Sequence, residues 1–343
     1  MDDQEDAASA EKGFGPYLRA IEGRSASAAD AAAVRSEARS SGPVLARAAE
    51  EWSRRDAVHY LCGDFQELEV HYDQADEILW YYMQPLGRPS FTLGLLQDIR
   101  RLQDRVQELF ADPDSAGGPR VRYMVVASAV PETFNLGGDL RLMAQLVRSQ
   151  DRKHLEMYAR SCIDVLYRGA VALDLPLVTV SLVQGHALGG GFEAALANNV
   201  IVAEETAKFG LPEILFNLFP GMGAYSLLAR RVGPVDAERM IVSGKVYGAP
   251  ELHEMGVVDV LAPAGQGEQV VYEFVAQQRR RFNAHLAIYQ ARQRFHPITH
   301  EELKDIAAIW VDTALRLTDA DLRKIDRLAQ SQIRRKLRSV GND

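Results

Sequence analysis

Residues 183–223 read VQGHALGGGFEAALANNVIVAEETAKFGLPEILFNLFPGMG. The residues just before and into this stretch, 177–183 (LVTVSLV), are apolar and β-branched, which is typical of a buried strand. Glycines then turn the chain, and residues 192–196 are expected to start a helix. A strand, a glycine turn and a helix N-terminus leave free backbone N–H groups that can face a negative ligand atom.

Two glutamates, Glu193 and Glu213, lie twenty residues apart in these apolar, glycine-rich surroundings. Glu193 falls in the first turn of the expected helix, where a carboxylate that only complements the helix dipole is common. Glu213 is either a loop carboxylate or part of the first turn of a helix that begins at Pro212. Each feature has such a structural explanation alone, but their order together indicates a site with two carboxyl groups.

The segments GHALGGGFEAAL and FGLPEILFNLFPGMG resemble the core of the crotonase (enoyl-CoA hydratase/isomerase) superfamily, whose hydratases carry a GGG-x-E turn, a G-x-P-E segment and a PG-x-G turn. An upstream loop, FNLGGDL at residues 134–140, resembles the superfamily's F-x-x-G-x-D-[LI] loop. The resemblance implies an α/β fold with a crotonase-like spiral of ββα units and a C-terminal helical region. It also implies that the backbone N–H groups of Gly138 and Gly190 form an oxyanion hole.

A narrower resemblance is to the diffusible-signal-factor synthases, which make cis-2-unsaturated fatty acid signals in bacteria. It rests on FNLGGDL, VQGHALGGGFEAAL, GLPEILFNLFPGMGAYS, IWVDTA and DRLAQSQ, and it covers residues 65–335. It implies dehydration of a 3-hydroxyacyl thioester followed by hydrolysis of the thioester. The implied carrier is acyl carrier protein, with CoA as the alternative, because Arg141 stands where CoA-dependent hydratases usually have a lysine. The superfamily implies a homotrimer, and the resemblance implies no cofactor.

The resemblance also gives the two glutamates their roles. Glu193 would hold the water or hydroxyl at C3 of the substrate, and Glu213 would exchange the proton at C2. Loss of the C2 proton builds negative charge on the thioester oxygen, which each N–H donor of an oxyanion hole stabilises by roughly 3 kcal/mol. Apolar surroundings and a neighbouring like charge both raise the pKa of a carboxyl group, which suits the pair to acid–base chemistry.

The residues that follow Glu213 are nearly all apolar as far as Met222, which favours a long acyl chain as the ligand. Met222, Trp310 and Leu328 are expected to line an acyl tunnel, and ordinary core packing is the alternative for each of them. Residues 301–317 form an amphipathic helical stripe that must cover other structure, because such a helix is not stable alone.

Composition is that of an ordinary globular protein, with 343 residues, 47% hydrophobic and 25% charged. The formal net charge of −8 argues against a nucleic-acid partner. The scattered histidines form no metal site, and Cys62 and Cys162 are expected to be reduced thiols rather than one disulfide. There is no apolar run of membrane-spanning length and no signal-like N-terminus, so a cytoplasmic enzyme without a membrane span is expected.

Three regions are expected along the chain: a flexible N-terminal arm at 1–55, a crotonase-like core at 65–262 and a helical region at 268–338. The main elements expected within them are a hairpin at 68–73 and 77–83, helices at 91–110 and 274–291, and strands at 121–128 and 257–260. The basic residues at 279–281 and 334–338 are either solvated or a docking site for acyl carrier protein.

Two other functions remain open. The first is an ordinary enoyl-CoA hydratase or isomerase, which would leave the thioester intact. The second is a crotonase-fold protein that acts as a binding partner in signalling, through the N-terminal arm or the helical end.

Overall fold

The computed structural model describes residues 57–111 and 119–340, with side chains described as far as residue 330. The chain divides into two units, Met1–Ser53 and Arg54–Asp343, and the fold described below belongs to the second. The arm expected at 1–55 lies outside the described residues. Within the described ranges, no helix has the length and apolar character needed to cross a bilayer.

A six-stranded sheet forms the centre of this unit. β1 (Leu68–Asp73) and β2 (Ile78–Met83) form the expected antiparallel hairpin, and Asp73 shapes its turn by accepting the N–H groups of Ala75 and Asp76. Four parallel strands follow in space: β3 (Tyr123–Ser128), β5 (Val178–Val183), β7 (Val200–Glu204) and β10 (Val260–Ala262). β5 is the strand that the sequence predicts before the glycine turn.

A second sheet contains the short strands β4 (Thr133–Asn135), β6 (His186–Leu188), β8 (Lys208–Gly210) and β9 (Val246–Gly248), in that order. Consecutive strands of the chain enter different sheets: β3, β5 and β7 belong to the first sheet, and β4, β6 and β8 to the second. A helical segment follows each such pair. This repeated step confirms the predicted spiral of ββα units.

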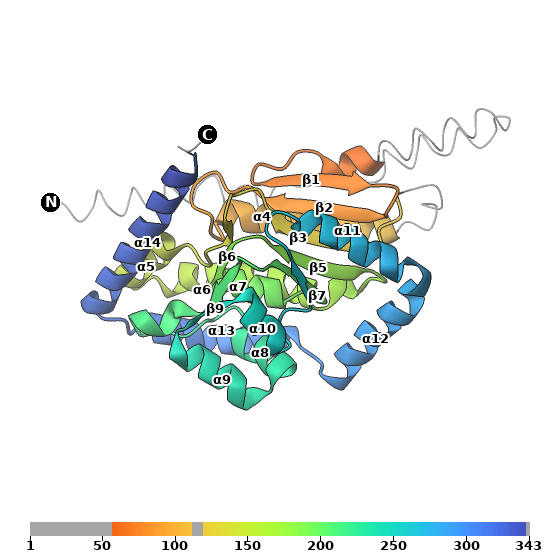
Figure 1. Cartoon of the computed structure of the whole chain (residues 1–343). Coiled ribbons are helices and arrows are strands. Elements are labelled where there is room, and N and C mark those ends of the chain that lie inside the picture. The colour runs from red at the N-terminus through yellow and green to blue at the C-terminus, as the bar shows by residue number, and fades with distance from the viewer. Residues whose placement is uncertain (1–56, 112–118, 341–343) are drawn as a thin grey trace. The chain divides into compact units, whose positions relative to one another are not determined.

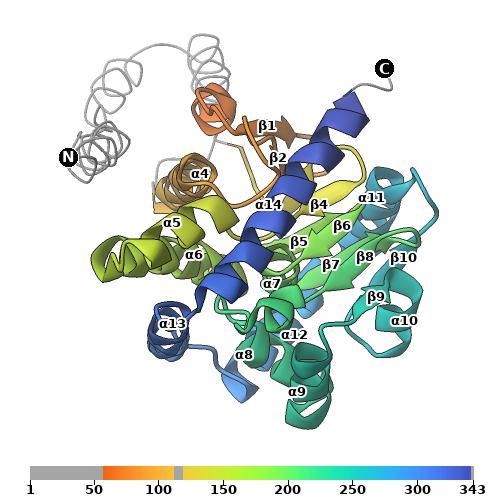
Figure 2. The same ribbon diagram turned by 90° about the vertical axis from the view of Figure 1, so that its left-hand side faces the viewer.

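Helices cover both faces of the large sheet (Figures 1 and 2). Those that precede β7 in the chain are α4 (Leu93–Ala111), α5 (Leu140–Arg148), α6 (Arg152–Ala170) and α7 (Gly190–Leu196). The later ones are α8 (Ala224–Val232), α9 (Pro234–Ser243), α10 (Ala249–Glu254), α11 (Gly267–Gln278), α12 (Phe282–Phe295), α13 (His300–Ala314) and α14 (Asp319–Val340). α13 packs on α6, and α14 runs across α5 (Figure 2).

The alternation of side chains along β2 divides the core in two. Ile78 and Trp80 face the cluster that α11 and α12 cover, whereas Leu79, Tyr81 and Met83 face the larger cluster with α4, α5 and α6. Because side chains alternate along a strand, the sequence of β2 alone predicts that these two sets lie on opposite faces. The larger cluster contains the functional residues discussed below.

The helix predicted at 274–291 is wrong as a single element. α11 ends at Gln278, the turn of 3₁₀-helix Arg279–Arg281 changes the direction of the chain, and α12 begins at Phe282. Arg279 forms an ion pair with Asp76 at 3.3 Å, and Phe282 packs edge-on against Tyr123 with ring centroids 5.5 Å apart. These contacts with distant residues have no signature in the local sequence.

The last strand is also displaced from the prediction of 257–260, since β10 begins only at Val260. The N–H groups of Val257 and Val258 both donate to the carbonyl of Leu252, at 2.8 and 3.1 Å. They close the C-terminal end of α10 and therefore do not pair with β7.

Candidate active site

A cavity of about 60 Å³ lies where the loop before α5, the start of α7 and the turn before α8 meet. Six of the seven residues predicted from the sequence line it: Gly138, Gly190, Glu193, Glu213, Met222 and Trp310. The other lining residues are Leu140, Met143, Tyr158, Ala159, Cys162, Phe216, Leu218 and Gly221. Leu328 is not among them; it lies on α14, half-buried against the hydrophobic core.

Glu193 is held by the turn that the PG-x-G motif forms. It lies in the first turn of α7, as predicted, and is only 1% exposed. Its Oε1 accepts the backbone N–H groups of Met222 and Ala224, at 2.8 and 2.9 Å. Because Ala224 is the first residue of α8, the carboxyl group of Glu193 also satisfies N–H groups at the start of that helix. Its position is therefore fixed from two helices.

Glu213 reaches the same cavity from the turn of 3₁₀-helix Pro212–Phe216, with Pro212 as its first residue. Its Oε2 is buried and has no hydrogen-bond partner among the described residues. Its Oε1 lies against Gly189, which has a φ of +53° and leaves no room for a Cβ. The glycine turn thus makes space for the second carboxyl group.

Both carboxyl groups are poorly solvated, which decides their acid–base behaviour. Burial, followed by the charge of Glu213, raises the pKa of Glu193, although the N–H groups of Ala224 and Met222 oppose the change. Burial also raises the pKa of Glu213. Two negative charges in one poorly solvated site repel each other, so the pair retains protons to a higher pH than exposed glutamates do.

The two glycines of the predicted oxyanion hole lie side by side. Gly190 is the first residue of α7, so its N–H has no acceptor within the helix. A Cβ on Gly190 would lie 3.5 Å from the backbone nitrogen of Gly138 and 2.5 Å from Sδ of Met222. The backbone groups of both glycines therefore border the same part of the cavity.

Several neighbours of the site escaped prediction from the sequence. Tyr158 and Cys162 lie on one face of α6, and the sequence pattern alone indicates ordinary core residues at both positions. Both cysteines are free thiols, as predicted, and burial raises the pKa of Cys162 to about 12. Arg88 forms an ion pair with Asp139, the N-cap of α5, at 2.6 Å.

In the part of the chain that the structure describes, no group of three or more His, Cys, Asp or Glu side chains is placed to bind a metal ion.

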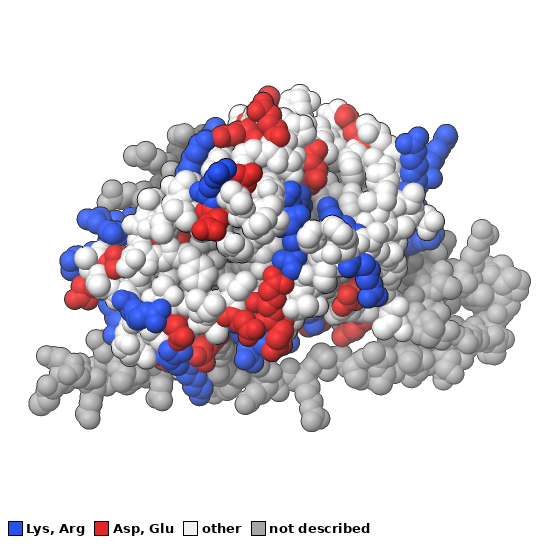
Figure 3. Space-filling view, turned by 90° about the horizontal axis from the view of Figure 1, so that it is seen from below, with Lys and Arg blue, Asp and Glu red and all other residues white. Residues whose placement is uncertain are grey.

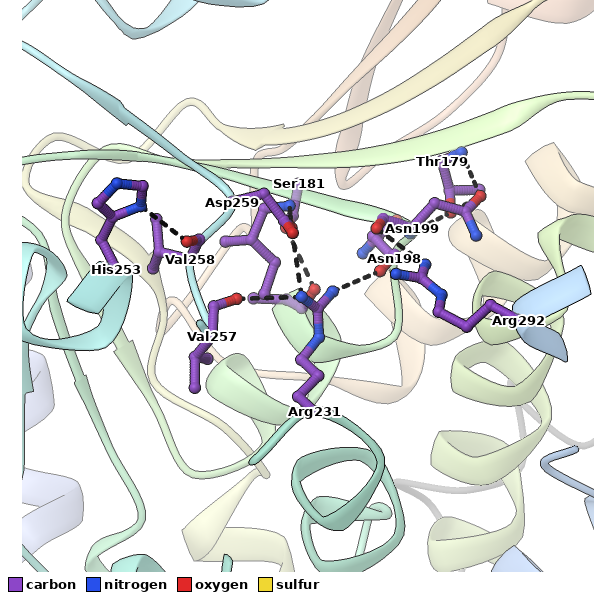
Figure 4. Close-up of polar contacts among 12 residues, drawn as sticks. Thr179, Ser181, Asn198, Asn199, Arg231, His253, Val257, Val258, Asp259 and Arg292 are labelled. Atoms are coloured by element: carbon purple, nitrogen blue, oxygen red, sulfur yellow. Dashed lines mark hydrogen bonds and ion pairs between the residues drawn. The ribbon is translucent and has the colours of Figure 1, made fainter. Parts of the chain in front are cut away.

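A polar network anchors the opposite end of α7 (Figure 4). Arg231 donates to the carbonyl of Asn198 at 3.0 Å and pairs with Asp259 at 3.2 Å. Arg292 of α12 donates to the carbonyl of Asn199 at 3.0 Å. Cations at the C-terminal end of a helix interact favourably with its dipole. The network therefore stabilises the helix whose first turn carries Glu193.

A sequence model described as enoyl-CoA hydratase/isomerase matches residues 110–316, more than half of the 343-residue chain. The chain belongs to the enoyl-CoA hydratase/isomerase family. A probable enoyl-CoA hydratase (echA8) of Mycobacterium tuberculosis is 31% identical over 52% of this chain and 64% of its own length. The α subunit of the fatty acid oxidation complex of Vibrio campbellii is 32% identical over 47% of this chain and 22% of its own length. The chain thus spans less than two thirds of these relatives.

Solved structures share the fold. A putative polyketide-biosynthesis enoyl-CoA hydratase (pksH) from Bacillus subtilis superposes with a TM-score of 0.62, at 19% identity over 78% of this chain and 99% of that one. DspI from Pseudomonas aeruginosa gives a TM-score of 0.57, at 24% identity over 73% and 96%. At these identities the likeness concerns the fold alone.

Proposed function

We propose that the protein acts on an acyl thioester through an enolate, with Glu193 and Glu213 as the acid–base pair. The observation that carries the proposal is that two carboxyl groups, one on buried Glu193 and one on half-buried Glu213, meet two glycine backbones in one cavity. Gly138 and Gly190 would donate to the thioester oxygen as negative charge develops on it. Glu213 would move the C2 proton, and Glu193 would hold the water or hydroxyl at C3.

The finer proposal is a dual activity that makes a cis-2-unsaturated fatty acid signal. A 3-hydroxyacyl thioester first loses water: Glu213 takes the C2 proton, and Glu193 protonates the departing C3 hydroxyl. The pair then activates a water molecule, which adds to the thioester carbonyl, and the thiol of the carrier leaves. Supporting it are the segments that resemble diffusible-signal-factor synthases, which include both glutamates.

The size of the cavity bears on the acyl chain. About 60 Å³ is far below the roughly 300–1,000 Å³ of sites that enclose a drug-sized ligand. A long chain would therefore displace lining side chains, and Met222 and Trp310 are our candidates for that movement. Met222 has a flexible thioether side chain, and Trp310 is half-buried directly over Gly221. Leu328 stays a prediction that no contact with the cavity supports.

We further propose that the substrate arrives on acyl carrier protein and that the enzyme is a homotrimer. The basic turn Arg279–Arg281 is a weak candidate for the carrier's docking site, because Arg279 already pairs with Asp76 near the β1–β2 hairpin. On the face seen in Figure 3, acidic and basic side chains are interspersed rather than gathered in one basic patch.

We also propose that residues 65–262 are the catalytic core and that residues 268–338 close it. The position of Trp310 at the cavity supports this division.

Mass spectrometry of the products tests the dual activity. Purified protein is mixed with 3-hydroxydodecanoyl acyl carrier protein and, separately, with the CoA thioester. Free cis-2-dodecenoic acid would support the proposal, and its absence from Glu193→Gln and Glu213→Gln would support both roles.

Two other outcomes favour the alternatives. An unsaturated product that remains on its carrier would indicate an ordinary hydratase or isomerase, and the Mycobacterium tuberculosis relative is named as a probable enoyl-CoA hydratase. No turnover of either thioester would favour a crotonase-fold binding protein in signalling, which should keep its cellular effect when both glutamates are replaced.

A further inference from the structure

The loop that carries Gly138 is held from one side by a short stretch of extended chain. Phe91 and Gly138 form an isolated parallel bridge. In this bridge the N–H of Phe91 donates to the carbonyl of Gly137 at 2.8 Å. Nearby, the N–H of Leu136 donates to the carbonyl of Pro89 at 2.7 Å. Since the peptide group is planar, the bond from Phe91 also sets the direction in which the N–H of Gly138 points.

The other half of this bridge is occupied by a side chain. In a regular parallel ladder, the N–H of Asp139 would donate to the carbonyl of Phe91. Here the Tyr158 hydroxyl accepts from the N–H of Asp139 at 2.7 Å and donates to the carbonyl of Phe91 at 2.8 Å. One hydroxyl therefore satisfies both backbone groups and bridges the two chain segments beside Gly138.

Tyr158 is itself rigidly placed. It lies on α6, is 4% exposed, and borders the cavity. A Cβ on Gly138 would lie 3.3 Å from its oxygen. Burial raises the pKa of Tyr158 well above its ordinary value, so the hydroxyl keeps the proton that it donates. The Arg88–Asp139 ion pair fixes the side chain of Asp139, whereas the Tyr158 hydroxyl binds its backbone N–H.

We propose that Tyr158 is a positioning residue for the oxyanion hole, because its hydroxyl, inserted between Asp139 N–H and Phe91 C=O, aims the N–H of Gly138 at the substrate carbonyl. This inference rests on the proposed thioester chemistry. Tyr158→Phe keeps the ring and removes the bridging hydroxyl, leaving two buried backbone groups without partners. It also removes the contact of that hydroxyl with the Cys162 side chain. Gly138 then moves, and the stabilisation lost appears in kcat rather than in KM.

We expect Tyr158→Phe to lower kcat by about tenfold to a hundredfold. This effect is no larger than the one expected from removing a whole oxyanion-hole donor. KM should change little. The matched control is Tyr167→Phe, which removes a hydroxyl from the same helix at a half-buried position outside the cavity. It should leave kcat unchanged.

The direct test is the infrared carbonyl stretch of a bound analogue. The probe is a dodecanoyl-CoA analogue with a ¹³C carbonyl and CH₂ in place of the thioester sulfur, which cannot be hydrolysed. We expect wild type and Tyr167→Phe to lower the stretching frequency relative to buffer, and Tyr158→Phe to lose a large part of that shift. Chemical denaturation of all three proteins is measured in parallel.

The outcomes separate the two proposals. If wild type lowers the frequency and Tyr158→Phe lowers it equally, Tyr158 has only a structural role and the inference is overturned, even if the variant is less stable. If wild type binds the analogue without any shift, the proposed oxyanion hole fails and the inference fails with it. If Tyr158→Phe does not fold, Tyr158→His replaces it, because a histidine ring can still donate and accept a hydrogen bond. We expect Tyr158→His to keep part of the frequency shift. Phe91→Ala is not a suitable substitute, since it would remove a buried ring.

Discussion

At the scale of single residues, the two glutamates differ in how the protein holds them. Two backbone N–H groups bind Oε1 of Glu193, whereas Oε2 of Glu213 has no partner among the described residues. We expect Glu193→Gln and Glu213→Gln each to lower the rate of thioester turnover by about 100- to 10,000-fold, because each removes an acid–base group. Steady-state kinetics measure the effect, and the exposed Glu205→Gln serves as control. A variant that kept the wild-type rate would remove that glutamate from the mechanism.

The pH dependence of stability follows from the same pair. Burial raises the pKa values of both groups above their ordinary 4.5, and the charge of Glu213 adds to the effect on Glu193. The folded state then binds more protons than the unfolded chain above this pH. The free energy of unfolding therefore falls as the pH rises from the ordinary value through the raised ones.

Glu213→Gln tests this dependence, because glutamine cannot ionise. We expect the fall in unfolding free energy with rising pH to be less steep in Glu213→Gln than in wild type and in Glu205→Gln. Urea denaturation at a series of pH values measures the three curves. Parallel curves would show that Glu213 has the same pKa in the folded and unfolded states.

At the scale of elements, the N-terminus of α7 lies close to the loop before α5. The glycines at this N-terminus therefore differ in how much space an added side chain would have. A Cβ on Gly191 would collide with the backbone carbonyl of Asn135, whereas one on Gly190 would meet mainly the flexible end of Met222. We expect Gly191→Ala to lower the unfolding free energy by about 1–3 kcal/mol or more, and Gly190→Ala to lower it less. Gly87→Ala is the control, since no atom lies within 4 Å of its added Cβ.

Urea denaturation of these three variants ranks them. The order Gly191→Ala, Gly190→Ala, Gly87→Ala from least to most stable is the expected result. Equal stability of all three would mean that the close approach between α7 and the loop at Asn135 is relaxed at little cost.

Elements with local signals were predictable from the sequence. The hairpin has the expected range in β1 and nearly so in β2, because alternating apolar residues and Asp73 specify it locally. The break at Arg279 was not predictable, since it depends on Asp76 about two hundred residues earlier in the chain. Tyr158 was missed for the same reason: its partners are Phe91 and Asp139, 67 and 19 residues away. An amphipathic helix presents such a tyrosine as a core residue.

At the scale of the whole molecule, the motifs fix where the chemistry lies better than they fix the substrate. The glycine turns, Glu193 and Glu213 meet as their order in the sequence predicts. The acyl tunnel does not follow in the same way, because Leu328 lies outside the cavity and the cavity is small. Chain length depends on side-chain packing between distant helices, which motif spacing does not encode.

The proposed homotrimer is a prediction at this scale. Sedimentation equilibrium of the full chain should give three times the mass of one chain, without dependence on the presence of acyl thioester. A mass equal to one or two chains over the concentrations used for the activity assays would contradict it.

The most direct test of the central claim is the interconversion of 2-dodecenoyl and 3-hydroxydodecanoyl thioesters by wild type, Glu193→Gln and Glu213→Gln. The reaction is followed by mass spectrometry in ¹⁸O-labelled water, with the CoA and acyl carrier protein forms measured separately. Our account predicts that wild type exchanges the C3 oxygen with solvent on at least one carrier and that both variants lose this exchange. Exchange at the wild-type rate in either variant, or none by wild type on both carriers, would contradict the assignment of the glutamate pair.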